Sequence, residues 1–407
     1  MKGNKKRDIV FLCQYFYPEH NSSATLPFDA ASALADAGFS VDVLCGSPKE
    51  YSDTENVPSR ETVNGIEIKR INYFQTKRSK KLGRLVNYFS FSAGALLKLS
   101  VLRNYKAVIV YSNPPVLPLV AVIANILFGT KIVFVSFDVY PEVAVASQNI
   151  KAGSMIEKGM SFINRMMFKR VTKAVALTDE MKKFLTDSRK ELTEDRIVTI
   201  PNWAHEAPPQ ISSKKAKMEL GYKEQDFVVS YLGNMGICQE METMLKAIKA
   251  LKADEDIHFI FAGHGVKTER IREETSDNKN VRMYGFLQGE DFEKVLAASS
   301  CCVLSLEKYM KGLGAPSKLY SYMQAGKPLI AVSDKDSYLK TETEDRKIGI
   351  HVDINDVSAF TEAVRYLYNN PEMADAMAEN AKNIYETACS KTICGEKYIK
   401  LFDEILS

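Results

Sequence analysis

The stretch from Gly312 to Val332 reads GLGAPSKLYSYMQAGKPLIAV, a glycine-bearing loop followed by a helical pattern and an apolar run. Pro316 pre-sets a first helical turn, and Gly326 is typical of a helix end. A helix over 316–325 that leads directly into a strand over 329–332 is the repeating unit of a parallel sheet with helical crossovers. This stretch predicts the α/β fold class.

The same alternation continues on both sides of this stretch. Short apolar runs, each followed by a helical pattern, recur at 9–13, 41–45, 108–111, 132–136 and 174–177, and again at 227–232, 258–262, 281–284 and 302–306. Runs that are apolar throughout are typical of strands buried on both faces, which occur mainly in parallel sheets. The sequence predicts two Rossmann-like, doubly wound parallel sheets.

The length of 407 residues exceeds what one core usually organises. The segment 201–215 is polar and contains Pro208 and Pro209, so we place the domain boundary there, between 205 and 206. A second domain is expected over 206–385, and the helical segment 386–407 is expected to pack towards the first. The segment before His205 holds 28 basic and 19 acidic residues, and the rest holds 26 and 32, so the domains should meet different partners.

Composition excludes several classes of protein. Hydrophobic residues make up 45% and charged residues 26%, which is ordinary globular usage. The seven cysteines are scattered without a Cys-x-x-Cys pair, so we expect reduced cytoplasmic thiols. The five histidines are isolated and show no metal-ligand spacing, so no metal site is expected. The longest apolar stretches, 116–128 and 132–137, are interrupted and too short to predict a transmembrane helix.

The first strand is followed by a loop without glycine, from Gln14 to Ser23. A dinucleotide-binding fold would place Gly-x-Gly-x-x-Gly there, so a nicotinamide cofactor is disfavoured. The chain also lacks the Gly-x-x-x-x-Gly-Lys-Ser/Thr loop of phosphate-loop ATPases. Helix capping by Asn21, Ser22 or Ser23 and contact of these residues with a ligand are both open.

Three glycine-bearing loops follow strands of the second domain and should share one edge of its sheet. Glycines let a backbone approach a ligand closely, and Lys318 would add a point charge for a phosphate. The alternative is an ordinary helix start with a solvated lysine. Together the loops predict a nucleotide-diphosphate site that includes Gly233, Asn234, Gly236, Gln239, Gly263, Gly265, Pro316, Ser317, Lys318 and Leu319, with Glu307 on the same wall.

Several motifs occur in an order that resembles one family. They are Tyr17-Pro18-Glu19, Ser112-Asn113-Pro114-Pro115, Phe137-Asp138-Val139-Tyr140-Pro141-Glu142, Pro201-Asn202, Gly233-Asn234-Met235-Gly236, Pro316-Ser317-Lys318-Leu319-Tyr320 and Ala325-Gly326-Lys327-Pro328. Together they resemble family 4 of the glycosyltransferases, which have the GT-B fold. The resemblance is to the bacterial capsule and O-antigen branch, similar to fucosamine transferases.

The resemblance implies that the second domain binds a nucleotide diphosphate sugar and the first binds the acceptor, without a metal and with retention at the anomeric carbon. The acceptor side would include Pro18, Asn21, Ser22, Ser23 and Asn113. Asp138 is the candidate for orienting the acceptor or supporting an oxocarbenium-like state, with Glu142 as a weaker candidate. A buried carboxylate that caps a loop is the competing interpretation of Asp138.

The chain departs from the family pattern at its usual acidic and basic positions. The two family glutamates, eight positions apart, correspond to Leu313 and Ser321 here. The loop from Gly233 to Glu240 carries Asn234 and Gln239 where many relatives have basic residues, so Lys318 and backbone groups would have to meet the phosphate charge. The usual first-domain histidine is also missing.

The segment 77–91 joins five basic residues within 77–84 to an apolar and aromatic run. This composition is typical of a helix that lies on an anionic membrane surface, although a solvated face would show it too. No nucleic-acid-binding module accompanies the charge, so nucleic acid is not an expected partner. We therefore expect a cytoplasmic protein that contacts the inner face of the cell membrane peripherally.

The sequence predicts a retaining glycosyltransferase that moves a sugar from a nucleotide diphosphate donor to a lipid-linked glycan in surface polysaccharide synthesis. Two alternatives stay open. An epimerase of the same fold would act on the nucleotide sugar alone. A non-catalytic partner subunit would explain the absent glutamates.

Overall fold

The computed structural model describes residues 6–48, 57–76, 81–204 and 207–407, which form two compact units. Unit 1 comprises Met1–Asn202, Gly312–Ala315 and Lys391–Ser407, and unit 2 comprises Trp203–Lys311 and Pro316–Ser390. The predicted boundary at 205/206 falls on residues outside the described part, and the units divide three residues earlier. The short segment 312–315 groups with unit 1 although its sequence neighbours belong to unit 2.

Unit 1 contains an eight-stranded sheet in the order β3-β4-β2-β1-β5-β6-β7-β8. All neighbours pair in parallel except β3 and β4, which are antiparallel. The strands are β1 (Arg7–Cys13), β2 (Val41–Gly46), β3 (Arg60–Val63), β4 (Ile66–Ile71), β5 (Tyr105–Tyr111), β6 (Lys131–Ser136), β7 (Lys173–Ala176) and β8 (Ile197–Thr199). Its central strands are buried on both faces, as predicted for a parallel sheet.

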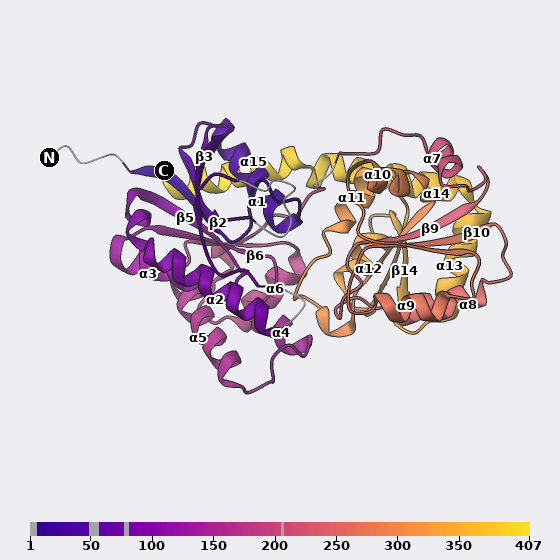
Figure 1. The fold of residues 1–407 in the computed structure, drawn as a ribbon, viewed down its shortest axis with the longest axis horizontal. Helices are drawn as coiled ribbons and strands as arrows, with labels where there is room; N and C mark the ends of the chain where they lie inside the picture. Colours follow the sequence, from indigo (N-terminus) through magenta and orange to yellow (C-terminus); the bar gives the residue numbers. More distant parts are fainter. Residues whose placement is uncertain (1–5, 49–56, 77–80, 205–206) are drawn as a thin grey trace. The chain divides into compact units, whose positions relative to one another are not determined.

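Helices cover both faces of this sheet, with α2, α3 and α5 on one side and α1 and α15 on the other (Figure 1). The helices of unit 1 are α1 (Ser22–Asp36), α2 (Lys81–Leu97), η1 (Leu99–Asn104), α3 (Pro118–Phe128), α4 (Glu142–Ala146), α5 (Met155–Arg170), α6 (Asp179–Ser188), η2 (Glu194–Arg196) and α15 (Lys391–Leu406). Lys391 at the start of α15 contacts Asp29 of α1, with Nζ 2.5 Å from Oδ1. The C-terminal helix is therefore part of unit 1.

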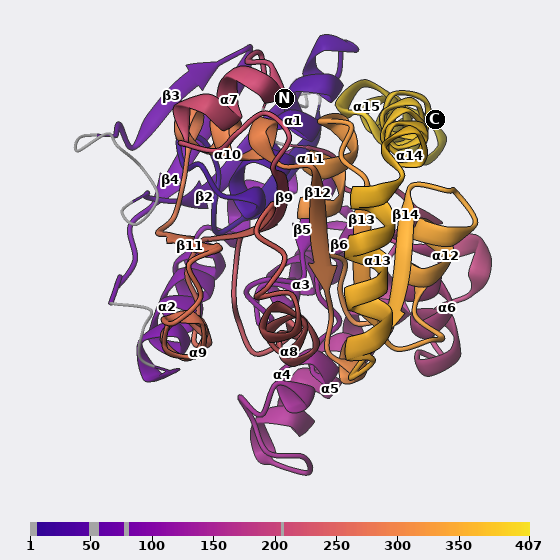
Figure 2. The same ribbon diagram turned by 90° about the vertical axis from the view of Figure 1, so that its right-hand side faces the viewer.

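Unit 2 contains a parallel sheet in the order β11-β10-β9-β12-β13-β14. Its strands are β9 (Phe227–Leu232), β10 (Ile257–Ala262), β11 (Val281–Tyr284), β12 (Cys301–Ser305), β13 (Leu329–Ser333) and β14 (Gly349–Asp353). Figure 2 shows α13 running along these strands. One apolar cluster joins the sheet to α8, α9 and α13, so these helices cover the same face.

The helices of unit 2 follow the predicted crossovers. They are α7 (Ser213–Glu219), α8 (Glu242–Ala250), α9 (Thr268–Thr275), α10 (Gly289–Ala298), η3 (Lys308–Met310), α11 (Lys318–Gln324), α12 (Tyr338–Glu344), α13 (Val357–Asn369) and α14 (Pro371–Ile384), with a π-helical turn, η4 (Tyr385–Cys389). The two parallel sheets expected from the sequence are confirmed. In unit 1, α2 ends at Leu97 and the 3₁₀ segment η1 follows it. Within the described residues, no helix combines the length and apolarity needed to cross a bilayer.

Candidate functional site

The side chain of Lys318 lies at the carboxyl-end edge of the unit 2 sheet. Lys318 is the first residue of α11, and its Nζ is buried, with no hydrogen-bond partner among the described residues. Nζ lies 3.6 Å from the centroid of the Tyr231 ring, which supplies a cation–π contact from the end of β9. Burial lowers the pKa of Lys318 to about 7. A buried cation without an acceptor is costly, so this position is suited to an anionic ligand.

The loop after β9 lies next to the Lys318 side chain. A Cβ atom on Gly233 would lie 3.4 Å from Cε and 3.5 Å from Nζ of Lys318. Gly233 has φ +121°, a conformation that favours glycine. The neighbouring loop after β10 packs even closer, since a Cβ on Gly263 would lie 2.1 Å from the Gly233 carbonyl oxygen. Gly233 therefore lies between the Lys318 side chain and the loop after β10. The close approach of these two loops requires glycine at position 263.

The remainder of the glycine-rich loop is held by its own side chains. The Gly236 N–H donates to Oε1 of Gln239, and the Tyr231 hydroxyl donates to the Asn234 carbonyl oxygen. A Cβ on Gly236 would lie 2.7 Å from Nδ2 of Asn234, so a larger residue there would displace the Asn234 side chain. Asn234 and Gln239, which were predicted to contact the donor, both take part in shaping the loop.

A second cation reaches this loop from the segment after β10. The Lys267 Nζ donates to the Gln239 carbonyl oxygen at 2.5 Å and pairs with Oε1 of Glu307 at 2.8 Å. A Cβ on Gly265 would lie 2.2 Å from the Met235 carbonyl oxygen, so Gly265 permits this contact between the two loops. The sequence identified Glu307 but not Lys267. A lysine four residues beyond Gly263 on a predicted site loop was the signal that could have found it.

The helix predicted over 316–325 corresponds to α11. It has seven residues, Lys318–Gln324. Pro316 and Ser317 precede it, and Leu319 is 1% exposed, so Leu319 packs into the core. Ser321, at a family glutamate position, is also buried. The chemistry at this helix rests on the Lys318 side chain.

In unit 1, Asp138 lies just beyond the carboxyl end of β6. Its backbone forms an antiparallel bridge with Gly314, and the Val139 N–H donates to the Leu313 carbonyl oxygen at 2.8 Å. The Asp138 N–H donates to the Ser112 hydroxyl at 3.1 Å. Burial raises the pKa of Asp138 to about 6. Its backbone is thus fixed while its carboxyl group titrates near neutral pH.

The other predicted residues of unit 1 fall into two groups. Glu142 pairs with Arg189, with Oε2 2.7 Å from Nη2, so its charge already has a partner. Pro18 and Asn21 precede α1, while Ser22 and Ser23 form its first turn. Asn21 occupies the N-cap position without a capping hydrogen bond from its side chain. Capping, the alternative explanation for Asn21, is therefore wrong.

Adjacent strands of unit 1 also end in buried amides without partners. Gln14 follows β1 and is 1% exposed, yet neither of its side-chain polar atoms has a hydrogen-bond partner among the described residues. Oδ1 of Asn113, after β5, is also buried without a hydrogen-bond partner among the described residues. Because β1, β5 and β6 are neighbours, these groups and Asp138 follow adjacent strands at one edge of the sheet. The sequence analysis placed Gln14 at the start of the loop after the first strand but did not identify it as a site residue.

The described residues contain no cluster of three or more histidine, cysteine, aspartate or glutamate side chains arranged to hold a metal ion. The basic side chains of the segment 77–84 lie outside the part of the chain whose side chains are described. In the described remainder of 77–91, Val86 is 37% and Phe89 58% exposed, whereas Phe91 is fully buried.

Two family models match consecutive parts of the chain. A model described as "Glycosyl transferase 4-like domain" matches residues 28–203, and one described as "Glycosyl transferases group 1" matches 212–384. A relative named "Probable glycosyltransferase WbjE" from Pseudomonas aeruginosa is 26% identical over 292 residues, which cover 70% of this chain and 71% of the relative.

Solved structures of glycosyltransferases share the fold. Sucrose-phosphate synthase from Thermosynechococcus elongatus has a TM-score of 0.73 at 14% identity, covering 98% of this chain and 99% of that one. HepE from Anabaena, solved in complex with UDP-glucose, has a TM-score of 0.70 at 14% identity and covers 98% and 100% of the two chains. The chain is thus a glycosyltransferase of the GT-B fold, with a glycosyl transferase 4-like domain followed by a glycosyl transferases group 1 domain.

Proposed function

We propose that this enzyme transfers a glycosyl group from a nucleotide diphosphate sugar to a lipid-linked glycan acceptor, with retention and without a metal. The observation that carries the proposal is the buried Lys318 ammonium, which has no acceptor in the described part of the chain and lies beside the Gly233 loop. A diphosphate would supply the missing anionic acceptor. HepE, which shares the fold, was solved with UDP-glucose bound, and this supports a donor of the same class.

In the proposed reaction, the bond between the anomeric carbon and the diphosphate oxygen breaks, and its electron pair leaves with the nucleoside diphosphate. An acceptor hydroxyl oxygen bonds to the anomeric carbon on the same face and passes its proton to the departing phosphate. Lys318 stabilises the charge that develops on the diphosphate. Asp138 orients the acceptor or supports the oxocarbenium-like state.

The acceptor side rests on the carboxyl-end edge of the unit 1 sheet. Gln14 and Asn113 carry buried amide atoms without partners in the described chain, and unpaired buried polar groups are costly unless a ligand uses them. Amides suit the hydroxyl groups of a glycan. We further propose that the protein acts in bacterial surface polysaccharide synthesis, in the branch similar to fucosamine transferases, at the inner face of the cell membrane through 77–91.

The test combines a donor screen with a transfer assay. Uridine, guanosine and thymidine diphosphates are first compared by thermal shift, because a ligand that binds the folded state must raise its melting temperature. The sugar nucleotide of the best base is then incubated with and without a lipid-extracted glycan acceptor, and the anomeric configuration of the product is read by NMR. Transfer that requires acceptor and retains configuration supports the proposal.

The epimerase alternative gives the opposite result in the same assay, since it would convert the nucleotide sugar without acceptor. If none of the three diphosphates raises the melting temperature, the assignment of Lys318 to the donor diphosphate is wrong.

A further inference from the structure

A cavity of about 630 Å³ opens at the amino-terminal edge of the unit 1 sheet, the edge opposite to Gln14 and Asp138. We call it the amino-edge cavity. It is lined by residues from the starts of four strands and from the segments that lead into them: Lys6, Arg7, Asp42, Glu67, Lys69, Arg103, Asn104, Tyr105 and Phe128. Substrates of parallel α/β sheets bind at the carboxyl ends of the strands, so this cavity is separate from the proposed acceptor site.

The strand register arranges four of the lining residues in two pairs. Arg7 of β1 is paired with Tyr105 of β5, and Asp42 of β2 is paired with Glu67 of β4. Side chains at paired positions of parallel strands point to the same face of the sheet. Asp42 is paired with Val10 of β1 and not with Arg7, so the two pairs are joined into one polar surface by the contacts of the Asp42 carboxylate with Arg7 and Tyr105.

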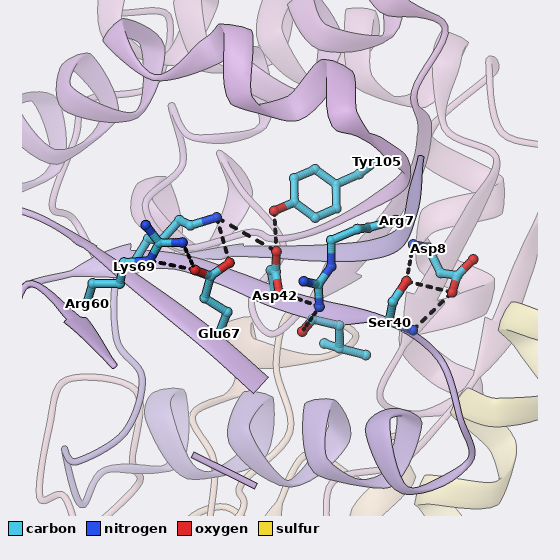
Figure 3. Close-up of polar contacts among 9 residues, drawn as sticks. Arg7, Asp8, Ser40, Asp42, Arg60, Glu67, Lys69 and Tyr105 are labelled. Atoms are coloured by element: carbon cyan, nitrogen blue, oxygen red, sulfur yellow. Dashed lines mark hydrogen bonds and ion pairs between the residues drawn. The ribbon is translucent and has the colours of Figure 1, made fainter. Parts of the chain in front are cut away.

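Asp42 is the buried centre of this surface, with 1% exposure (Figure 3). Its Oδ1 lies 2.8 Å from Nη2 of Arg7, and its Oδ2 accepts a hydrogen bond from the Tyr105 hydroxyl at 2.5 Å. Lys69 Nζ lies 3.8 Å from the same carboxylate and 2.9 Å from Oε2 of Glu67. Replacing a buried ionic network by apolar residues is often neutral or stabilising, so the network's function is better explained by holding Arg7 and Lys69 in place.

Positive charge remains after the acidic residues are paired. Glu67 forms ion pairs with both Lys69 and Arg60. Asp8, which follows Arg7 in β1, forms an ion pair with Lys106 and accepts a hydrogen bond from the Ser40 hydroxyl. Lys6 contacts only the Phe128 carbonyl oxygen among described groups, at 3.4 Å. Arg103 is exposed, and no described residue pairs with it.

We propose that the amino-edge cavity is a second binding site, specific for a phosphate-bearing anion. Lys6 and Arg103 supply charge that is not yet compensated, and Arg7 is held by Asp42 with its side chain 41% exposed. The volume exceeds that of a phosphate and accommodates a phosphate with an attached glycerol-sized group.

The surroundings indicate that a membrane lipid supplies this phosphate. Leu97 ends α2 just before η1, which lines the cavity, and it is 86% exposed. Leu127 and Ile126 precede the lining residue Phe128 and are 60% and 49% exposed. Exposed apolar side chains beside uncompensated cations are typical of surfaces that contact anionic bilayers. A free phosphate ester shares the recognition chemistry and is the other source that the experiment separates.

The experiment compares two charge-reversal variants of the full-length protein. Lys6→Glu with Arg103→Glu changes the cavity, whereas Lys151→Glu with Lys183→Glu makes the same change in net charge at exposed lysines of unit 1 outside the cavity lining. Each protein is titrated with phosphatidylcholine vesicles with and without phosphatidylglycerol, and separately with soluble glycerol phosphate. Lys318 is intact in both variants, so phosphate binding at the donor site contributes equally.

We expect the cavity variant to bind phosphatidylglycerol vesicles at least about tenfold more weakly than the wild type, and the control variant to lose less than about twofold. A cavity-specific loss with glycerol phosphate alone would keep the site and identify a soluble phosphate ester as its ligand. If both variants behave alike towards both probes, the site does not exist. If the charge reversal lowers the melting temperature, the variant Lys6→Ala with Arg103→Ala takes its place in the same comparison.

Discussion

The Lys318 ammonium nitrogen lies 3.6 Å from the centroid of the Tyr231 ring, and this π face is the nearest compensation that the described protein offers its charge. A cation–π contact contributes roughly 0.5 to 2 kcal/mol, much less than the cost of burying an isolated charge. The arrangement therefore holds a lysine in a position where an anion is the natural partner.

Lys318→Ala should weaken binding of the nucleotide diphosphate by about 1.5 to 3 kcal/mol, because a charge-assisted hydrogen bond to phosphate is lost. The matched control is Lys246→Ala, which removes an exposed lysine from α8 of the same unit and should leave the affinity unchanged. Calorimetric titration of both variants measures the difference. Equal affinities in the wild type and Lys318→Ala would contradict the donor assignment.

Binding of the sugar nucleotide should take up a proton. Burial lowers the pKa of Lys318 to about 7, so the free enzyme holds a mostly neutral lysine at pH 8. A bound diphosphate favours the charged form and raises that pKa, so affinity should fall as the pH rises above 7. Calorimetry at pH 8 in buffers of different ionisation enthalpy should report proton uptake by the wild type and much less by Lys318→Ala. Equal uptake by the two proteins would refute the titration.

Gly263→Ala should disturb the donor loop in two ways, through the strained backbone conformation of alanine and through a steric clash with Gly233. The new Cβ would lie 2.1 Å from the Gly233 carbonyl oxygen, whereas Gly289, which also has a positive φ, has no atom within 4 Å of that position. We expect Gly289→Ala to cost about 1 to 2 kcal/mol of folding free energy, the usual penalty for alanine in this region. Gly263→Ala should cost more and also weaken nucleotide binding. Chemical denaturation and titration of both variants decide it.

The sheets could be predicted because buried parallel strands are apolar throughout, as β9 and β12 are. The sequence missed β4, whose residues IEIKRI alternate with charge, and β14, which carries a histidine and an aspartate. Both are close to the outer edge of their sheets, where fewer apolar contacts are needed. Their pairing depends on neighbours that local sequence does not reveal.

Lys318 could be identified from the sequence as a candidate site residue because a lysine after Gly-x-Gly-x-Pro has a recognisable pattern. Its partner Tyr231 could not, because a tyrosine inside an apolar strand looks like any other core residue until the fold places α11 beside β9. The amino-edge cavity was missed for a similar reason: Arg7, Asp42 and Tyr105 are far apart in sequence and meet only in the fold, where Arg7 and Tyr105 both contact the Asp42 carboxylate.

Phe89→Ser should weaken binding of the protein to anionic vesicles by about fivefold or more, if the segment 77–91 lies on the membrane as proposed. Phe89 is 58% exposed, and burying a phenylalanine contributes about 1.5 to 3 kcal/mol. Phe286→Ser is the control, because Phe286 is exposed to a similar extent, 54%, in unit 2. Vesicle co-sedimentation at low salt compares them. Identical losses in both variants would remove 77–91 from the membrane contact.

Asp138→Asn should lower turnover by at least about a hundredfold while donor affinity stays nearly intact, since a positioned carboxylate contributes on that scale. Burial raises the pKa of Asp138 from 3.8 to about 6, so the native carboxyl binds a proton more tightly than the unfolded chain does. Its ionisation therefore destabilises the fold progressively as the pH rises from about 4 to 6 and by a constant amount above that. The asparagine variant should thus be more stable than the wild type at pH 8, by about 1 to 3 kcal/mol, with the gain vanishing near pH 4.

A carboxylate whose role is to cap a loop predicts instead that the Asp138→Asn variant is less stable than the wild type at pH 8. Single-turnover transfer and denaturation at both pH values separate the two roles, and a destabilised variant with near-normal turnover would exclude Asp138 from the reaction.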